Sequence, residues 1–431
     1  MPMSQSFRER LFPALPAIIR KFGSPFHIYD ELGIRQTIRR LKAAFTSRSI
    51  TFQEFYAVKA LPKPAIMDII MDEGCGFDCS SIPELRLARN AGAKPEDIMF
   101  TSNNTSQEEF MEARLNGGCI LNLDGIEFIR QVPRPFPELI CFRLNPGNQK
   151  TGDEVNSIIG DPLDSKYGVP IENILEAFGI AQRAGATRFG LHTMVCSNDR
   201  DYKHMVATVK LLLEVATHLF EILSIKLEFI NMGGGIGIPY HPDDQEFDID
   251  SLASACQKLL ADFAAKHGYA PKLFMESGRA ITGPHGVLVN KVINVYSKYK
   301  DIIGVQVAMP ALMRVGMYSS AYHHCELLYP DGTIRSGEER IQTVAGPICE
   351  NCDVLAKGIM LPPARRGDII ITHDAGAHGS AMGFNYNGRC RPQELILNMN
   401  GTVRRICRAE TYDDLDVRHH GLKGEEHMLK L

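Results

Sequence analysis

A lysine, Lys59, closes the apolar, strand-like stretch FYAVKA. A lysine amine can condense with an aldehyde, although most lysines at strand ends simply reach water. Two further stretches carry residues suited to chemistry at the end of an apolar run: NMGGGIG contains Gly234 and Gly235, and MESGR contains Glu276. Consecutive glycines expose backbone N–H groups that suit a phosphate. These residues can act together only if the fold brings the ends of their strands to one place.

Strand-like stretches alternate with helical ones between residues 50 and 283. Eight are strand-like: 51–60, 76–81, 97–104, 119–124, 139–145, 188–197, 226–235 and 272–278. The stretches with helical periodicity include 64–73, 83–91, 107–116, 171–184, 202–220 and 251–267. Eight strand-helix units predict an α/β fold in which residues 26–283 form a (β/α)8 barrel.

The chain changes character after residue 283, where strand-like stretches are no longer separated by long helices. We expect a second, all-β domain, formed by residues 1–25 and 284–431. The strand-like run PFHIYD at 25–30 could join either part, although we place the barrel boundary at residue 26. The tail from Asp413 is charged and poor in core residues, which predicts a frayed helix or disorder.

Polar and glycine residues gather at the carboxyl ends of the predicted barrel strands, where such barrels hold their active sites. They are Lys59, Asp78, Ser80, Asn103, Asn145, Ser197, Gly233, Gly234, Gly235, Glu276, Gly278 and Arg279. The glycine run would cradle a phosphate, with further donors from Ser197 and the Gly278–Arg279 turn. A lysine, a phosphate cradle and a carboxylate at one barrel mouth together indicate pyridoxal 5'-phosphate (PLP) as the cofactor.

Longer motifs extend from about residue 25 to 408. They are YAVKA, GFDCSSIPEL, FRLNPG, INMGGGIGIPY, MESGRAITG, ALMRVGMY, GPICENCDVL and HDAGAHGSAMGFNYNGRCRP. In this order they resemble the motifs of the fold-type III PLP-dependent decarboxylases, and among these a divergent branch of the diaminopimelate decarboxylases. The resemblance implies a PLP-binding barrel with a C-terminal all-β domain, and a homodimer in which the active site is shared across the interface.

The resemblance assigns the cofactor site residue by residue. Lys59 would bind PLP covalently, and Glu276 would keep the pyridine nitrogen protonated, which makes the ring a strong electron sink. A related racemase is expected to place an arginine at that nitrogen, so Glu276 indicates a decarboxylase. The other cofactor-binding residues would be Asp78, Met194, Ser197, Gly234, Gly235, Gly278, Arg279 and His378.

The resemblance also assigns the residues that act on the substrate. Cys349, from the partner subunit, would return a proton to the carbon that loses CO2, because a thiol proton is loosely held near neutral pH. Glu350 would accept the distal ammonium group. Arg279, Arg314 and Tyr318 would hold the distal carboxylate, which the forked arginine side chain matches. A substrate with an amino acid group at each end fits this set, which predicts decarboxylation of meso-diaminopimelate to L-lysine.

Some positions depart from the pattern of that family. Met194 stands where a histidine usually stacks on the cofactor, Cys196 replaces a glycine, and His378 replaces a tyrosine near the phosphate. Either Met194 packs on the ring face or His192 takes a different role. RVGMY around Arg314 replaces the commoner RPALY. Alternative substrates are therefore carboxynorspermidine, ornithine, or a modified or carrier-bound amino acid, and a further alternative is a PLP-binding protein without catalysis.

The composition is that of an ordinary globular protein, with 431 residues, 44% apolar, 23% charged and a formal net charge of -4. No apolar stretch is long enough to cross a bilayer and the N-terminus lacks a signal-like apolar region. We expect a cytoplasmic protein that binds neither membranes nor nucleic acid. Eleven cysteines in so long a chain indicate reduced thiols, and the spacing around CENC at 349–352 is a poor match to a zinc site, so we expect no metal.

Overall fold

The computed structural model describes residues 2–148 and 161–419 of the chain. The chain divides into two compact units. Residues 32–239 and 243–283 form the barrel unit, and residues 1–31, 240–242 and 284–431 form the β unit. Among the described residues, no helix has both the length and the apolar character that a membrane span needs.

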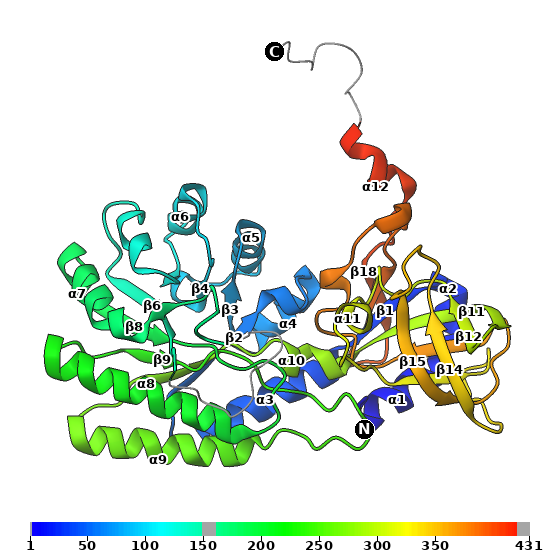
Figure 1. Cartoon of the computed structure of the whole chain (residues 1–431), viewed down its shortest axis with the longest axis horizontal. Helices are drawn as coiled ribbons and strands as arrows, with labels where there is room; N and C mark the ends of the chain where they lie inside the picture. The colour runs from blue at the N-terminus through cyan, green and yellow to red at the C-terminus, as the bar shows by residue number, and fades with distance from the viewer. Residues whose placement is uncertain (1, 149–160, 420–431) are drawn as a thin grey trace, which may run out of the picture. The chain divides into compact units, whose positions relative to one another are not determined.

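Within the described part of the barrel unit, eight parallel strands close into the predicted barrel (Figure 1). They are β2 (Phe52–Ala57), β3 (Gly76–Cys79), β4 (Ile98–Phe100), β5 (Ile120–Leu123), β6 (Leu139–Asn145), β8 (Arg188–His192), β9 (Phe229–Asn231) and β10 (Lys272–Met275). The pairs β10–β2 and β5–β6 complete the ring. Its interior holds apolar side chains, among them Phe55, Met99 and Phe229, so the barrel is a packed core.

Helix α3 precedes the first barrel strand and an α-helix follows each barrel strand except β5, which the 3-10 helix η4 (Ile126–Arg130) follows; the long helices lie outside the barrel (Figure 1). These α-helices are α3 (Glu31–Thr46), α4 (Pro64–Asp72), α5 (Ile82–Asn90), α6 (Gln107–Arg114), α7 (Ile174–Ala184), α8 (Tyr202–Leu223), α9 (Ile249–His267) and the short α10 (Arg279–Thr282). In α8, Met205, Leu212 and Leu219 share one face and are buried. The apolar residues that gave the sequence its helical periodicity are therefore those on the buried face of the helix.

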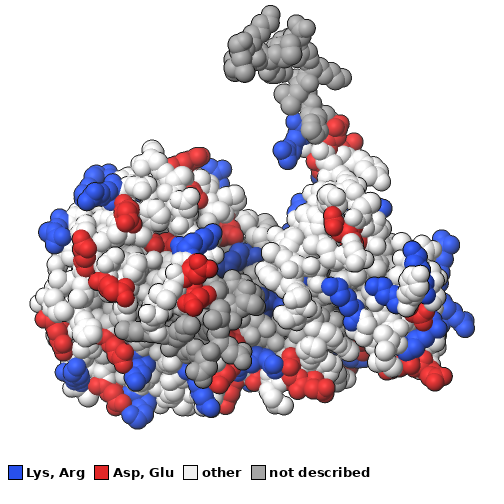
Figure 2. Space-filling view, in the orientation of Figure 1, with Lys and Arg blue, Asp and Glu red and all other residues white. Residues whose placement is uncertain are grey.

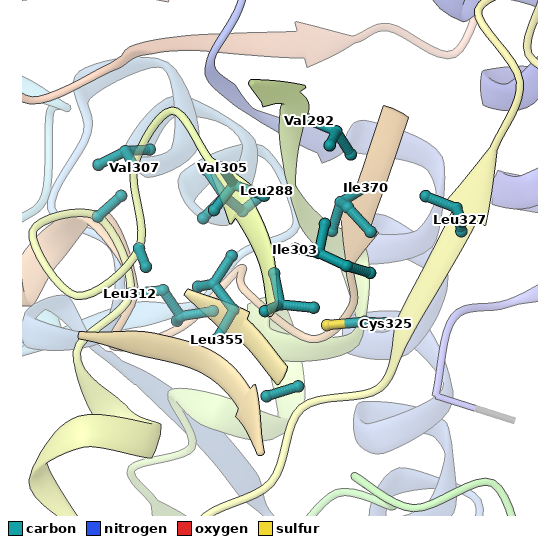
Figure 3. Packing of buried hydrophobic residues seen from close by; sticks show 14 of the residues in the cluster. Leu288, Val292, Ile303, Val305, Val307, Leu312, Cys325, Leu327, Leu355 and Ile370 are labelled. Atoms are coloured by element: carbon teal, nitrogen blue, oxygen red, sulfur yellow. The ribbon is translucent and has the colours of Figure 1, made fainter. Parts of the chain in front are cut away.

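The β unit is built on strands β1 (Phe26–Asp30), β11 (Gly286–Ser297), β12 (Asp301–Val305), β13 (Cys325–Leu328), β14 (Arg340–Ala345), β15 (Val354–Leu361), β16 (Ile369–Thr372), β17 (Gln393–Leu397) and β18 (Val403–Cys407). Side chains from several of these strands meet in one core, where Leu288, Ile303, Leu355 and Ile370 are fully buried (Figure 3). The N-terminal helices α1 (Gln5–Leu11) and α2 (Leu15–Phe22) contribute to a second core with β1, β11 and β17.

Strand β1 belongs to the β unit, which corrects the predicted barrel boundary at residue 26. The strand pairs antiparallel with β11 and parallel with β17, so both of its edges are hydrogen-bonded within that sheet. All five of its residues are buried. A strand buried on both faces carries no alternation that would assign it to one sheet rather than another, and the barrel unit begins only at residue 32.

The charged C-terminal segment begins as the short helix α12 (Tyr412–Asp416), which Thr411 and Asp414 cap reciprocally. The 3-10 turn η9 (Val417–His419) follows, and residues 420–431 of the predicted tail lie outside the described residues. On the face shown in Figure 2, basic and acidic side chains are interspersed over the barrel unit, without a large area of one sign.

Candidate active site

The barrel strands end at one rim, where most of the predicted cofactor residues stand. Lys59 lies in the 3-10 turn η2 (Val58–Ala60) directly after β2, and it is exposed although both of its neighbours are buried. The charge of Lys59 acts on the carboxyl groups of Asp78, in β3, and Glu276, which follows β10. The structure therefore brings the lysine and two of the predicted carboxyl groups together.

The glycine run after β9 has no room for side chains. A Cβ atom at Gly234 would lie 2.3 Å from the carbonyl oxygen of Glu276, and one at Gly235 would lie 2.4 Å from that of Cys196. Gly235 also has a φ angle of +107°, a backbone conformation that residues other than glycine rarely adopt. Only glycine fits these two positions, so backbone alone forms this part of the rim.

Gly278 and Met194 complete the rim. A Cβ atom at Gly278 would lie 2.9 Å from the Cβ atom of Ala60, beside Lys59. Met194 lies against the glycine run, because a Cβ atom at Gly233 would lie 2.9 Å from its own Cβ atom. The two other predicted donors follow directly: Ser197 comes after Cys196, and Arg279 begins α10.

Glu276 is buried, and each of its carboxylate oxygens has a polar neighbour. Asn231 donates from Nδ2 to Oε1 at 2.7 Å, and its Oδ1 accepts the N–H of Gly233 at 2.9 Å. Nε2 of His192 lies 3.2 Å from Oε2. Burial raises the pKa of this carboxyl group, but His192, Lys59 and Asn231 outweigh burial, so the pKa lies below its usual value. Glu276 is therefore a carboxylate at neutral pH.

Asp78 has the opposite character. It is buried, and its Oδ1 has no hydrogen-bond partner within the described chain. Burial and the charge of Glu276 raise the pKa of Asp78 well above its usual value, and Lys59 only partly offsets this effect. The environments of the two carboxyl groups thus shift their pKa values in opposite directions, downward for Glu276 and upward for Asp78.

Further buried polar atoms near the strand ends lack partners among the described residues. Among them are Nδ2 of Asn103, Oδ1 of Asn122, Oδ2 of Asp124, Nε2 of His192 and Oγ of Ser277. Because buried polar groups are normally hydrogen-bonded, this concentration indicates a site for a polar ligand. A glycine run without side chains, an exposed lysine and a buried carboxylate match the phosphate, the aldehyde and the ring nitrogen of PLP. The residues present therefore fit this cofactor.

The predicted substrate residues Arg314 and Tyr318 lie in the β unit. Arg314 is buried; its Nη1 is 3.0 Å from Nε2 of His323, and its guanidinium carbon is 4.1 Å from the centre of the Tyr240 ring. Asp374 is also buried, and neither of its carboxylate oxygens has a partner among the described residues. Burial raises the pKa of Asp374 well above its usual value, although the charge of Arg314 lowers it. Tyr318 is half-buried and donates its backbone N–H to the carbonyl oxygen of Arg314.

The predicted proton donor and its neighbour, Cys349 and Glu350, are exposed residues of the β unit. The backbone N–H of Cys349 donates to Oδ1 of Asn387 at 2.7 Å. Glu350 lines a pocket of about 470 Å³, together with Lys300, Asn351, Cys352, Val354 and Lys357. His378, also in this unit, is half-buried and has a φ angle of +54°.

Sequence reasoning missed the residues that hold the predicted ones in place. Asn231 and Asn122 are buried asparagines in otherwise apolar strands, and Asp374 follows the apolar strand β16. A polar residue within or at the end of such a strand is the one signal that could have identified them. Their partners come from distant strands, which the sequence does not show to be neighbours.

Comparison with known proteins identifies the family. Residues 33–283 match the family described as pyridoxal-dependent decarboxylase, pyridoxal binding domain. The chain belongs to the pyridoxal-dependent decarboxylases. It is therefore a PLP-dependent carboxy-lyase, which confirms the predicted family, reaction class and cofactor.

This decarboxylase is similar to several known proteins over nearly its whole length. Protein TabA of Pseudomonas amygdali pv. tabaci is 44% identical over 96% of this chain and 95% of its own. Diaminopimelate decarboxylase of Methanothermobacter thermautotrophicus is 33% identical over 92% of this chain and 91% of its own. The crystal structure of diaminopimelate decarboxylase from Helicobacter pylori complexed with L-lysine superposes with a TM-score of 0.85 at 26% identity, covering 94% of this chain and 99% of its own.

Proposed function

We propose that this decarboxylase converts meso-diaminopimelate to L-lysine and CO2. The buried Arg314 carries the proposal for the substrate, because a guanidinium held in a buried position is suited to a carboxylate at the far end of a substrate. The similarity to diaminopimelate decarboxylases, one of them crystallised with L-lysine, supports the same choice.

The barrel residues would hold PLP at the rim. Lys59 would bind it covalently, the glycine run and Gly278 would receive its phosphate together with Ser197 and Arg279, and Met194 would pack against its ring. When bound, PLP supplies an electron-withdrawing ring that accepts the electron pair left by the departing carboxylate. Glu276, ionised and fixed by two neighbours, would keep the ring nitrogen protonated. Asp78 and His378 are further proposed cofactor contacts.

The β unit would recognise the far end of the substrate and supply a proton. Arg314 and Tyr318, with Arg279 from the barrel unit, would hold the distal carboxylate, and Glu350 would hold the distal ammonium. Cys349 would protonate the carbon that loses CO2, since an exposed thiol can both give up and regain a proton.

We further propose a homodimer in which Cys349 and Glu350 serve the active site of the partner subunit. Both residues are exposed in the single chain, so they are available to a second copy. A twofold-symmetric dimer would build two equivalent sites in this way.

A modified or carrier-bound amino acid is the second candidate substrate, ahead of carboxynorspermidine and ornithine. Two observations favour this candidate. First, the chain is more similar to Protein TabA, at 44% identity, than to the M. thermautotrophicus diaminopimelate decarboxylase, at 33%. In addition, Met194, Cys196 and His378 depart from the family pattern. Ornithine fits less well, because it has no distal carboxylate for Arg314.

Release of CO2 from a panel of amino acids tests the proposal. The purified, PLP-loaded protein is assayed with meso-diaminopimelate, ornithine, lysine, arginine and carboxynorspermidine. We expect meso-diaminopimelate to exceed the others in kcat/KM by about 100-fold, and Arg314→Met to remove this preference while Arg404→Met, at an exposed position, retains it. A higher kcat/KM for another substrate would refute the proposed substrate.

A further inference from the structure

A series of buried side chains links Glu276 to the opposite strands of the barrel. His192 is 1% exposed, Asn122 is 2% exposed and Thr101 is 7% exposed. Nδ1 of His192 lies 3.0 Å from Nδ2 of Asn122. Nε2 of the same ring lies 3.2 Å from Oε2 of Glu276, a close contact that is not aligned as a hydrogen bond. Nδ2 of Asn122 also lies 3.0 Å from Oγ1 of Thr101. Asn122 lies in β5 and His192 in β8, while Thr101 follows β4 and Glu276 follows β10. These residues meet only because the barrel closes.

The contact with Asn122 decides where His192 carries its proton. An amide nitrogen can only donate, and its two hydrogens serve Thr101 and His192. Nδ1 of the imidazole must then accept, so the ring is neutral and its proton lies on Nε2, facing Glu276. If the amide of Asn122 were turned round, its oxygen would face Nδ1 and would require a proton there. A ring with protons on both nitrogens would be an imidazolium.

We infer that His192 is a positioning residue that holds Glu276 ionised and oriented, and that Asn122 fixes the tautomer required for this role. The inference rests on the proposed function, in which Glu276 faces the cofactor nitrogen. A neutral N–H donor stabilises a carboxylate and leaves its negative charge in place, whereas an imidazolium would cancel it. Asn231 fixes the other oxygen of Glu276, so that the carboxylate is held from two sides.

The ring nitrogens of His192 can be observed directly by NMR in the chain without cofactor. With ¹⁵N-labelled histidine, the variant His192→Gln identifies the signals of His192 by their loss. At neutral pH we expect the Nε2–H tautomer. In Asn122→Asp, which offers Nδ1 an acceptor, a proton should appear on Nδ1. An Nδ1–H or imidazolium form in the native chain would overturn the inference, as would unchanged ring signals in Asn122→Asp.

A matched pair of variants separates positioning from packing. Glutamine retains an N–H donor at His192, whereas methionine has a similar length and no donor. In the PLP-loaded enzyme we expect His192→Met to lower kcat by about 10- to 100-fold with KM nearly unchanged, and His192→Gln to recover most of this loss. Equal losses in the two variants would overturn the role as a donor. If no substrate releases CO2 the proposed function fails, while the NMR spectrum still decides the tautomer.

Discussion

The rim of the barrel and the 349–352 loop of the β unit both carry predicted catalytic residues, but the two regions are held very differently. At the rim, Glu276 is buried, accepts a hydrogen bond from Asn231 and lies 3.2 Å from Nε2 of His192. In the loop, Cys349 and Glu350 are exposed. The chain by itself organises the residues proposed to hold PLP, whereas the proposed proton donor is presented at a surface.

The cysteine thiols of the two regions also differ in burial: Cys196 at the rim is buried, whereas Cys349 in the loop is exposed. Burial raises the pKa of Cys196, next to the glycine run, to about 12, so this thiol keeps its proton. Cys349 is exposed and therefore accessible to a reacting carbon. From this comparison we expect the proposed cofactor binding and the proposed proton return to be separable, so that variants in one region remove one function and leave the other.

The largest effect is expected from removal of the rim lysine. Lys59→Ala should abolish the long-wavelength absorbance of the lysine-bound cofactor and lower turnover by roughly 10³-fold or more. Absorbance spectra of the PLP-loaded protein and CO2 release measure both effects. Lys258→Ala, at an exposed position of α9, is the control and should change neither. Retention of the absorbance band in Lys59→Ala would remove the lysine from its assigned role.

Neutralising the carboxylate of Glu276 should have the next largest effect. Glu276→Gln keeps the shape of the side chain but cannot hold a proton on a ring nitrogen, so we expect kcat to fall by about 10²-fold or more while PLP stays bound. Steady-state kinetics and the cofactor spectrum test this. Unchanged kcat would show that Glu276 serves only the packing of the rim.

Adding one methyl group to the glycine run should weaken cofactor binding. In Gly234→Ala the new Cβ atom would meet the carbonyl oxygen of Glu276 at 2.3 Å, so the backbone must shift. We expect the affinity for PLP, measured by titration, to fall by about 10- to 100-fold. Gly179→Ala, within helix α7, should leave the affinity unchanged. Equal affinities of both variants would argue against a phosphate site at Gly234.

The smallest effect concerns stability of the β unit rather than activity. Burial lowers the pKa of His285 to about 4, whereas an unfolded chain would have a value of about 6.5. Between these values the unfolded state binds more protons, so the free energy of unfolding should decrease by up to about 3 kcal/mol as the pH falls from 6.5 to 4. Thermal melting of His285→Gln between pH 7 and 5 should show a weaker decrease than the native chain. Parallel profiles would contradict this prediction.

The sequence predicted the barrel well because each strand and helix is marked locally. The predicted helix 64–73 corresponds to α4 (Pro64–Asp72), and 202–220 to α8 (Tyr202–Leu223), since apolar spacing and flanking residues define them. Strand β1 was assigned to the wrong unit because the identity of its partner strands, β11 and β17, depends on contacts more than 250 residues away.

The site was predicted only in part for a related reason. Lys59, the glycine run and Glu276 belong to recognisable motifs at strand ends. The contacts of Asn122 with Thr101 and His192 depend instead on barrel closure and side-chain direction, which no local pattern encodes.

The central claim is that the barrel of one subunit acts with the loop of another, and it can be tested by mixing two inactive variants. Lys59→Ala subunits retain Cys349, and Cys349→Ala subunits retain Lys59. Random reassociation of equal amounts makes half of the dimers mixed, each with one intact site of two. CO2 release should therefore recover to about a quarter of the native rate. A mixture no more active than the average of the two separate variants would contradict a shared site.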